Sequence, residues 1–139
     1  SIREPFRMSD TYFIAPRSGR FSEDALQAWH AFLGGLPTRR FPDGMYQVFE
    51  TVRERDEFAE YAARTGRQLT ESAEHVLVEA SRVTLHIIAC ALPGDTLAAF
   101  LEQLSARTAL RITDPMGNEM TIARLCKQIG AVPRGDPPD

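Results

Sequence analysis

The hydrophobic and polar positions along the chain change period several times, and each change marks a predicted element. Residues 11–15 (TYFIA) are aromatic and β-branched and stop at a proline, which is typical of a short strand. Ser22 then offers an N-cap followed by two acidic residues, and large apolar residues recur at helical spacing until the GGLP sequence at 34–37. The pattern therefore predicts a first strand followed by a first helix.

The same order of strand and helix repeats in the next part of the chain. A Pro-Asp-Gly turn at 42–44 leads into a predicted strand at 45–50. Residues 54–66 predict a helix, because their aromatic residues lie on one side and Gly66 supplies a C-terminal stop.

Residues 69–80 (LTESAEHVLVEA) fit two patterns. Their apolar residues follow helical spacing after a Thr70 cap, yet the sequence HVLVEAS also alternates like a strand. Because no Gly, Pro or Asn separates this segment from the next predicted strand, the pattern favours a helix slightly.

The second half of the chain predicts two more strands and two more helices. Residues 83–91 (VTLHIIACA) are apolar on both faces, which indicates a strand in the centre of a sheet. Asp95 is expected to cap a helix that ends near the sequence SART, and residues 109–119 (ALRITDPMGNE) predict a short strand that ends in a turn. Apolar residues of 119–130 form one stripe, which predicts a final helix that stops at Gly130.

These elements predict a mixed α/β fold of the α+β class, as a single two-layer sandwich of about four strands with helices packed on one face. The spacing from Thr11 to Ser22 equals the spacing from Thr84 to Asp95, eleven residues in each case. Two strand–helix units of equal spacing are what a ferredoxin-like βα duplication would produce, although the helix stripes do not align in phase.

The predicted domain covers residues 8–130. Met8 reads as a natural start, so we expect residues 1–7 to be a remnant that takes no part in the fold. Residues 131–139 (AVPRGDPPD) are rich in proline and polar residues, and we expect them to form a flexible tail.

Composition removes several function classes. The 139 residues are 43% hydrophobic and 25% charged, as in ordinary globular domains. The net charge of −3 does not attract polyanions, so we expect no duplex nucleic acid partner. Cys90 and Cys126 are too few for a disulfide framework, which favours reduced thiols and a cytoplasmic protein. The longest apolar run, VTLHIIACAL, is about half a membrane span, so no membrane contact is expected.

The sequence PRSGR between the first strand and first helix is a candidate anion site. A loop that joins a strand to a helix N-terminus presents free backbone amides, and Arg17, Ser18, Gly19 and Arg20 could bind phosphate or carboxylate oxygens there. The alternative is an ordinary turn with solvated arginines, because Glu23 and Asp24 follow at once and no phosphate-binding fingerprint is present.

The sequence TRRFPDG and its neighbours form a candidate partner surface. Tyrosine and arginine are enriched at the energetic centres of protein interfaces, and the candidate residues are Arg39, Arg40, Phe41 and Tyr46. The alternative is that the aromatic residues of this region belong to the core.

Other chemistry-bearing residues favour ordinary structural roles. His30, His75 and His86 lack metal-ligand spacing, so no metal and no cofactor are expected. Cys90 lies in an apolar run and is interpreted as a buried thiol, not as a nucleophile. The acidic residues after the second strand are interpreted as a solvated face; they are Glu50, Glu54, Asp56 and Glu57.

By exclusion, the sequence favours a non-enzymatic, cytosolic protein-binding module of bacterial type, such as an immunity protein, an adaptor or a secretion-chaperone-like protein. The alternative hypothesis is a small-ligand-binding or transferase-like domain that holds an anionic metabolite or cofactor at the Arg17–Arg20 loop. A purely structural domain of a larger protein is a third possibility.

Overall fold

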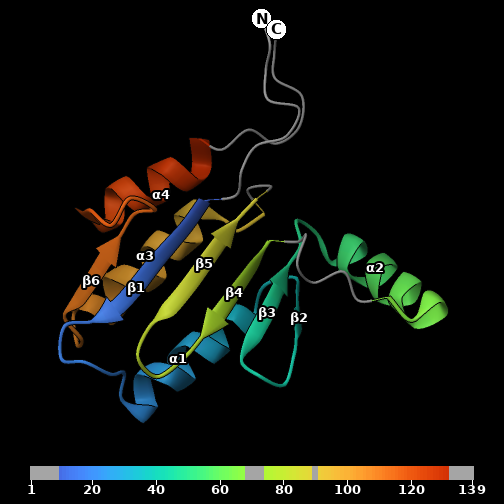
Figure 1. Ribbon diagram of the computed structural model, residues 1–139, viewed down its shortest axis with the longest axis horizontal. Helices are drawn as coiled ribbons and strands as arrows, with labels where there is room; N and C mark the ends of the chain where they lie inside the picture. Colours follow the sequence, from blue (N-terminus) through green and yellow to red (C-terminus); the bar gives the residue numbers. More distant parts are fainter. Residues whose placement is uncertain (1–9, 68–73, 89–90, 132–139) are drawn as a thin grey trace, which may run out of the picture.

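Along the described chain, two consecutive strands separate each helix from the next. The computed structural model describes residues 10–67, 74–88 and 91–131, and these have the predicted α+β class (Figure 1). The elements are β1 (Asp10–Pro16), α1 (Glu23–Gly34), β2 (Thr38–Arg40), β3 (Met45–Val48), α2 (Val52–Thr65), β4 (His75–Val78), β5 (Val83–Ile87), α3 (Gly94–Ser105), β6 (Leu110–Thr113), β7 (Glu119–Met120) and α4 (Ile122–Ala131). The predicted remnant at 1–7 and all but the first residue of the predicted tail lie outside the described residues.

The strands form one open sheet. Among the described residues it has seven strands in the order β2-β3-β4-β5-β1-β6-β7, and all neighbours are antiparallel. The prediction of about four strands is wrong, because β2 and β7 have only three and two residues and are too short to show alternation. The prediction that the strand beginning at Val83 is central is confirmed, since β5 occupies the middle of the sheet.

The segment that fitted two patterns contains a strand. Residues 75–78 form β4, which pairs with β3 on one side and with β5 on the other. The preference for a helix over 69–80 is therefore wrong at these positions, while 68–73 lie outside the described residues. A tight turn separates β4 from β5, closed by a hydrogen bond from the Glu79 amide to the Arg82 carbonyl at 3.0 Å. Ser81 and its neighbours make this turn without the glycine, proline or asparagine that the prediction required.

Alternation along the strands gives the sheet one covered and one open face. Ile14 on β1 and Val83 and Leu85 on β5 are fully buried, whereas Phe13 and Thr84 between them are half-buried. This is the period of two expected for a sheet that is covered on one side. The covered face therefore holds the hydrophobic core.

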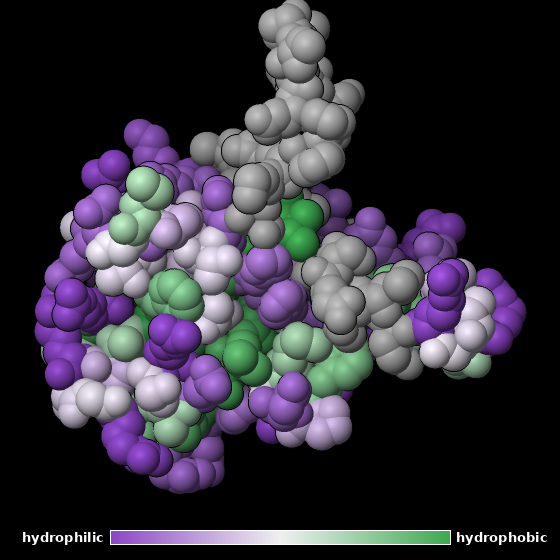
Figure 2. Space-filling model, in the orientation of Figure 1, coloured by the Kyte–Doolittle hydropathy of each residue, from purple (hydrophilic) through white to green (hydrophobic). Residues whose placement is uncertain are grey.

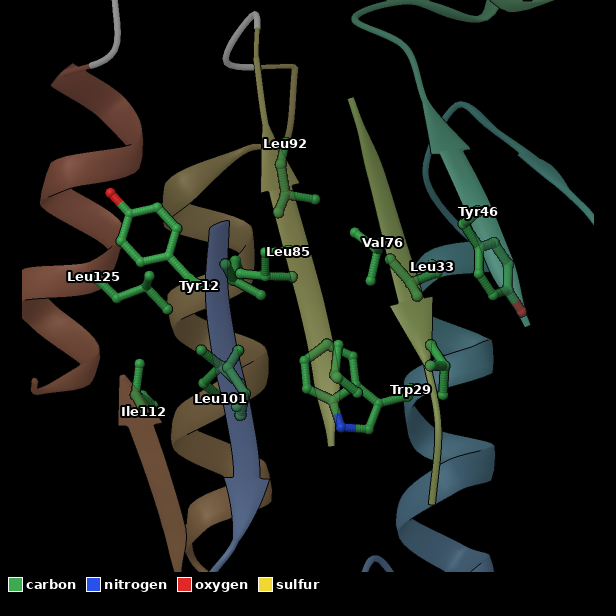
Figure 3. Packing of buried hydrophobic residues seen from close by; sticks show 14 of the residues in the cluster. Tyr12, Trp29, Leu33, Tyr46, Val76, Leu85, Leu92, Leu101, Ile112 and Leu125 are labelled. Atoms are coloured by element: carbon green, nitrogen blue, oxygen red, sulfur yellow. The ribbon is translucent and has the colours of Figure 1, made fainter. Parts of the chain in front are cut away.

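Three helices complete this core. Helices α1 and α3 lie behind the sheet in Figure 1, and α4 packs beside α3. Figure 3 shows Leu125 of α4 and Leu101 of α3 near β1, with Trp29 and Leu33 of α1 near β4 and β5. The largest fully buried side chains are Trp29, Tyr46, Ile14, Leu33, Leu85, Ile87, Leu92, Leu97, Leu101, Leu104, Leu125 and Ile129.

The helix ends test the predicted caps. Ser22 caps α1 as predicted, because its Oγ accepts from the Ala25 amide at 3.1 Å. Gly66 ends α2 as predicted, with a left-handed φ of 76° that suits glycine. The Asp95 cap is wrong, since α3 begins after Pro93 and no side chain caps it. Gly130 does not stop α4, which continues through Ala131.

Helix α2 departs from the predicted two layers. It extends away from the sheet in Figure 1, and Figure 2 shows it as a lobe whose visible side chains are mainly hydrophilic. Ala62 is its one buried residue, whereas α1 and α3 bury three each. Helices α1 and α3 thus pack on one face as expected. Helix α2 lies outside the two layers of the predicted sandwich.

The two strand–helix units of equal spacing have the same topology. In the second unit, β5 and β6 are joined through α3 and lie parallel with β1 between them, which is a split βαβ arrangement. In the first unit, β1 and β4 are joined through α1 and lie parallel with β5 between them, and the connection also carries β2, β3 and α2. The strands β4-β5-β1-β6, together with α1 and α3, therefore have the strand order of the ferredoxin-like duplication that the spacing suggested, and β2, β3, α2 and β7 are additions to it.

In the described part of the chain, no helix is both long enough and apolar enough to cross a lipid bilayer.

Candidate functional site

The loop from Arg17 to Arg20 is a tight turn at the end of β1. The Gly19 amide donates to the Pro16 carbonyl at 3.1 Å, and Gly19 has a φ of 106°, in the left-handed region that glycine tolerates. The Arg17 guanidinium pairs with the Glu119 carboxylate on β7, at the edge of the sheet. The structure thus gives Arg17 a carboxylate partner on another element.

Arg20 borders a small polar hollow at the start of α1. The hollow has a volume of about 320 Å³ and is lined by Arg20 and Arg107, together with Ser18, Ser22, Thr108 and Ala109. Two arginines at one hollow could attract an anion. The sequence pointed to Arg20 but gave no reason to join it to Arg107, which is 87 positions further along the chain.

Arg39 joins β2 to the projecting helix. Its guanidinium carbon lies 5.3 Å from the ring centre of Phe41 and 5.4 Å from that of Phe58 on α2. Phe58 in turn packs against Phe49 and Tyr61, with ring centres 5.5 and 6.4 Å apart. These residues are separate from the main core cluster, so the edge of the sheet carries its own aromatic and arginine cluster.

Tyr46 belongs to the core. It is 2% exposed, and its hydroxyl lies 2.7 Å from Nδ1 of His30 on α1. Burial raises the pKa of the Tyr46 hydroxyl, and the nearby Arg40 charge opposes that shift. Burial also lowers the pKa of His30, with a further lowering from Arg40 and an opposing effect from Glu23. Of the predicted partner residues, Arg39, Arg40 and Phe41 are therefore the ones with exposed surface.

A cleft lies where α2 meets the end of the sheet, and we call it the α2 cleft. Its volume is about 500 Å³, within the range of small-ligand sites. Four carboxylates line it, from Glu50, Glu54, Glu57 and Glu74. Apolar surface is contributed by Phe49, Phe58, Val48, Ile88 and Ala91. The sequence interpreted Glu50, Glu54 and Glu57 as a solvated face; they are exposed, and they also border this cleft.

Gln47 lines the α2 cleft with an unpaired hydrogen-bond donor. The residue is fully buried, its Oε1 accepts from Arg39 Nη1 at 3.4 Å, and its Nε2 has no partner among the described residues. A buried donor without a partner costs about 1–3 kcal/mol. Sequence reasoning missed Gln47, because a polar residue between Tyr46 and Val48 is what an alternating strand with one solvated face would contain.

Glu74 is buried beside Gln47 but has a structural role. Its exposure is 3%, and its carboxylate accepts from the amides of Ile88 and Ala91 at 3.2 Å each and of Leu92 at 2.7 Å. A carboxylate that accepts three backbone hydrogen bonds compensates for its burial. Glu74 therefore joins the start of β4 to the segment that follows β5.

The histidines and the described cysteine lack the arrangement of a metal or nucleophile site. His75 and His86 stack on the open face with ring centres 4.6 Å apart, and Thr11 Oγ1 lies 3.2 Å from His86 Nδ1. Among the described residues, no three His, Cys, Asp or Glu side chains are placed to hold a metal. Burial raises the pKa of the Cys126 thiol, which disfavours the nucleophilic thiolate, and Cys90 lies outside the described residues.

Comparison with known proteins assigns no family: no family model, no curated protein and no solved structure matches this chain.

Proposed function

We propose that this chain is a non-enzymatic protein-binding module whose partner contacts the free edge of the sheet at β2 together with α2. We call this region the edge surface and define it by Arg39, Arg40, Phe41, Phe58 and Tyr61. The observation that carries the proposal is the placement of Arg39 over the rings of both Phe41 and Phe58, outside the main core.

Such a cluster is suited to binding a protein partner because its side chains bury surface area at a small entropic cost. Arginine and aromatic residues are enriched in the centres of protein interfaces, where rigid rings and a planar guanidinium bury area with little loss of conformational entropy. Here Phe41, Phe58 and Tyr61 are half-buried in the isolated chain. A partner would complete their burial.

Helix α2 adds a second argument. It has 14 residues and buries only Ala62, and Val52 at its start is 50% exposed. A helix with so little burial gains limited stability from the domain, whereas an interface would use its remaining apolar surface. The edge surface would then be continuous from β2 to α2.

The cytoplasmic location and bacterial type belong to this proposal. The low cysteine content and the absence of disulfide-type spacing support the cytoplasmic location, and the bacterial type rests on the small size and mild acidity of the chain. Immunity proteins, adaptors and secretion chaperones all act by covering a surface of another protein, without chemistry of their own, and this is the mode of action proposed here.

Site-specific crosslinking tests the proposal. A photoreactive amino acid is placed at the exposed Pro42, between β2 and β3, and as a matched control at the exposed Glu102 on α3. In cells of the source organism, a defined partner should crosslink at position 42 and not at position 102. The combined Arg39→Ala and Phe41→Ala variant should abolish that crosslink.

Stability measurements decide whether the loss is specific. Phe41 is half-buried, so Phe41→Ala should lower the free energy of unfolding by less than about 1 kcal/mol if it is a surface anchor. A loss several times larger would mean that Phe41 is a packing residue. Equal crosslinking at both positions, or a crosslink that survives the double variant, would contradict the edge surface.

The hollow at Arg20 and Arg107 supports a second candidate, a small-ligand-binding or transferase-like domain for an anionic metabolite or cofactor. Titration with inorganic phosphate, monitored by amide NMR, should then shift Ser18, Gly19 and Arg20 saturably. Arg20→Ala with Arg107→Ala should remove the shifts, and a response that survives this double variant would reject the hollow as the site.

A further inference from the structure

The α2 cleft combines three features of a binding site. It has a volume of about 500 Å³, an acidic border and partly apolar walls. In addition, Gln47 presents a fully buried amide nitrogen with no partner among the described residues. An acidic border alone would be a solvated face, so the unpaired donor is the independent observation that points to a ligand.

The acidic residues at the cleft differ in how far their oxygens are engaged. Glu74 accepts three backbone hydrogen bonds and serves the fold. Glu54 uses Oε1 to accept from the Glu50 amide at 3.1 Å, next to the Thr51 cap of α2. Glu57 pairs with Arg53 on an exposed part of the same helix, at 3.3 Å, where ion pairs contribute little. Glu54 and Glu57 are therefore positioned to accept a cation from outside the chain.

Gln47 is held in place by the edge surface. Arg39 donates to its Oε1 at 3.4 Å, and the same guanidinium stacks on Phe41 and Phe58. This contact fixes which end of the amide is the carbonyl, so the NH₂ end is the one left for a ligand. A ligand for this position must carry a hydrogen-bond acceptor.

We propose that the α2 cleft binds a lysine- or arginine-containing segment of the protein partner, an inference that rests on the proposed protein-binding function. The cationic head group meets Glu54 and Glu57, its aliphatic stem lies against Phe49 and Phe58, and a main-chain carbonyl of the segment accepts from Gln47 Nε2. Lysine and arginine stems pack on aromatic rings while their charges stay at the polar border.

The charge of the cleft and its hydrogen-bond donor favour a basic peptide over other classes of ligand. An anionic ligand or a nucleic acid would be repelled by the carboxylates at the border. A metal ion is disfavoured because no suitable group of three ligating side chains occurs among the described residues. A polyamine would satisfy the carboxylates but carries no acceptor for Gln47. A peptide supplies both the cation and the carbonyl.

The probe is an acetylated and amidated pentapeptide of alternating alanine and lysine, titrated into the ¹⁵N-labelled full chain. We expect saturable shifts of the Gln47 side-chain amide and of the Glu54 and Glu57 backbone amides. The same peptide with norleucine in place of lysine keeps the stem and removes the charge, and it should bind at least about tenfold more weakly. Spermidine should likewise leave the Gln47 side-chain amide unshifted.

Three variants locate the contacts. Glu54→Gln with Glu57→Gln should weaken peptide binding about tenfold, and Gln47→Met about fivefold, because one removes the charge and the other the donor. Glu60→Gln on the same helix is the matched control, since Glu60 is exposed and is not among the residues that line the cleft, and its affinity should stay within about twofold. Circular dichroism shows whether each variant is folded.

Each outcome decides for or against the basic segment. No saturable shift at Gln47, equal affinity for the norleucine peptide, or equal loss in Glu60→Gln would overturn it. A spermidine response equal to the peptide response would assign the cleft to small amines instead. If a partner crosslinks at position 42 and the crosslink is unaffected by Glu54→Gln with Glu57→Gln, the inference fails while the proposed function stands. If the cleft binds the lysine peptide but no partner crosslinks at position 42, the proposed edge surface fails, while the preference of the cleft for basic peptides stands.

Discussion

The helices on the covered face and helix α2 have similar local sequence patterns, but they differ in how many of their residues are buried. Helices α1 and α3 each bury three apolar residues against the sheet, and α4 adds Leu125 and Ile129 to the same core. Helix α2 has well-formed ends at Thr51 and Gly66, yet it buries only Ala62 and extends beyond the sheet (Figure 1). Local signals thus form a helix in both places, but tertiary burial is concentrated in one.

We infer from this difference that the covered side supplies stability and that the α2 side supplies the proposed partner contacts. On the covered side, hydrophobic burial dominates and the side chains interlock. On the α2 side lie the stacked Arg39, a cleft bordered by carboxylates, and the Gln47 amide nitrogen, which has no partner among the described residues. A polar group that lacks a hydrogen-bond partner in the isolated domain can gain one from a bound protein. The comparison therefore predicts different costs for substitutions on the two sides.

The largest effect is expected from Trp29→Ala. Trp29 is fully buried and meets Phe21, Phe32 and Phe100 edge-on, with ring centres 4.8–6.4 Å away. Its removal should lower the free energy of unfolding by about 3–5 kcal/mol in urea denaturation. Tyr61→Ala on α2 is the matched control and should cost less than about 1 kcal/mol. Similar costs for the two variants would contradict the conclusion that burial is concentrated on the covered face.

Glu74→Gln is the next test, because the buried Glu74 carboxylate accepts three backbone hydrogen bonds. The new NH₂ group would face backbone amides that are themselves donors, so at least one hydrogen bond to Ile88, Ala91 or Leu92 would be lost. We expect a loss of about 3 kcal/mol in the free energy of unfolding. A loss no larger than that of the exposed control Glu60→Gln would show that these hydrogen bonds contribute little.

Gly44→Ala tests how firmly the β2–β3 turn is attached to the sheet. Gly44 has a φ of 91°, and an added Cβ would lie 2.7 Å from the Val78 carbonyl oxygen. We expect a loss of about 2 kcal/mol, larger than the loss of about 1 kcal/mol for Gly19→Ala. Gly19 also has positive φ but has open space around its Cβ position. Thermal unfolding of both variants measures the difference. Equal melting temperatures would mean that the β2–β3 turn shifts away from the Val78 carbonyl with no loss of stability.

Much of the fold could be predicted because its signals are local. The Ser22 cap, the Gly66 stop and the central position of β5 follow from residue type and alternation. The prediction failed where pairing decided the structure. His75–Val78 is a strand because β3 and β5 lie on either side of it, although its surroundings in sequence favoured a helix.

The candidate site was less accessible to sequence reasoning. The arginines at 39 and 40 were found from residue type, but Tyr46 turned inward and Phe58 entered the cluster from another element. Gln47 gave no signal, because alternation predicts whether a side chain faces the core and not whether a side chain on the opposite face is buried. The α2 cleft joins residues from β3, α2 and the ends of β4 and β5, a combination fixed only by the tertiary structure.

The smallest expected effect is a pH dependence of stability that arises from His86 on the open face and is influenced by Glu74. Burial lowers the pKa of His86, the neighbouring His75 lowers it further, and Glu74 opposes both. Since the folded-state pKa lies below the ordinary 6.5, the unfolded chain takes up a proton first as pH falls. Stability should therefore be lost as pH falls through 6.5 and should level off below the folded-state pKa.

His30 shifts in the same direction, so His86→Gln should reduce this dependence and not abolish it. NMR titration of the histidine Cε1–H signals measures the His86 pKa directly. In Glu74→Gln the opposing charge is gone, so the His86 pKa should fall further, while that of His30, which lies on the other face of the sheet, should not change. A His86 pKa at or above 6.5, or an identical value in Glu74→Gln, would separate the stacked histidines from Glu74 and confine the influence of that carboxylate to the backbone amides it binds.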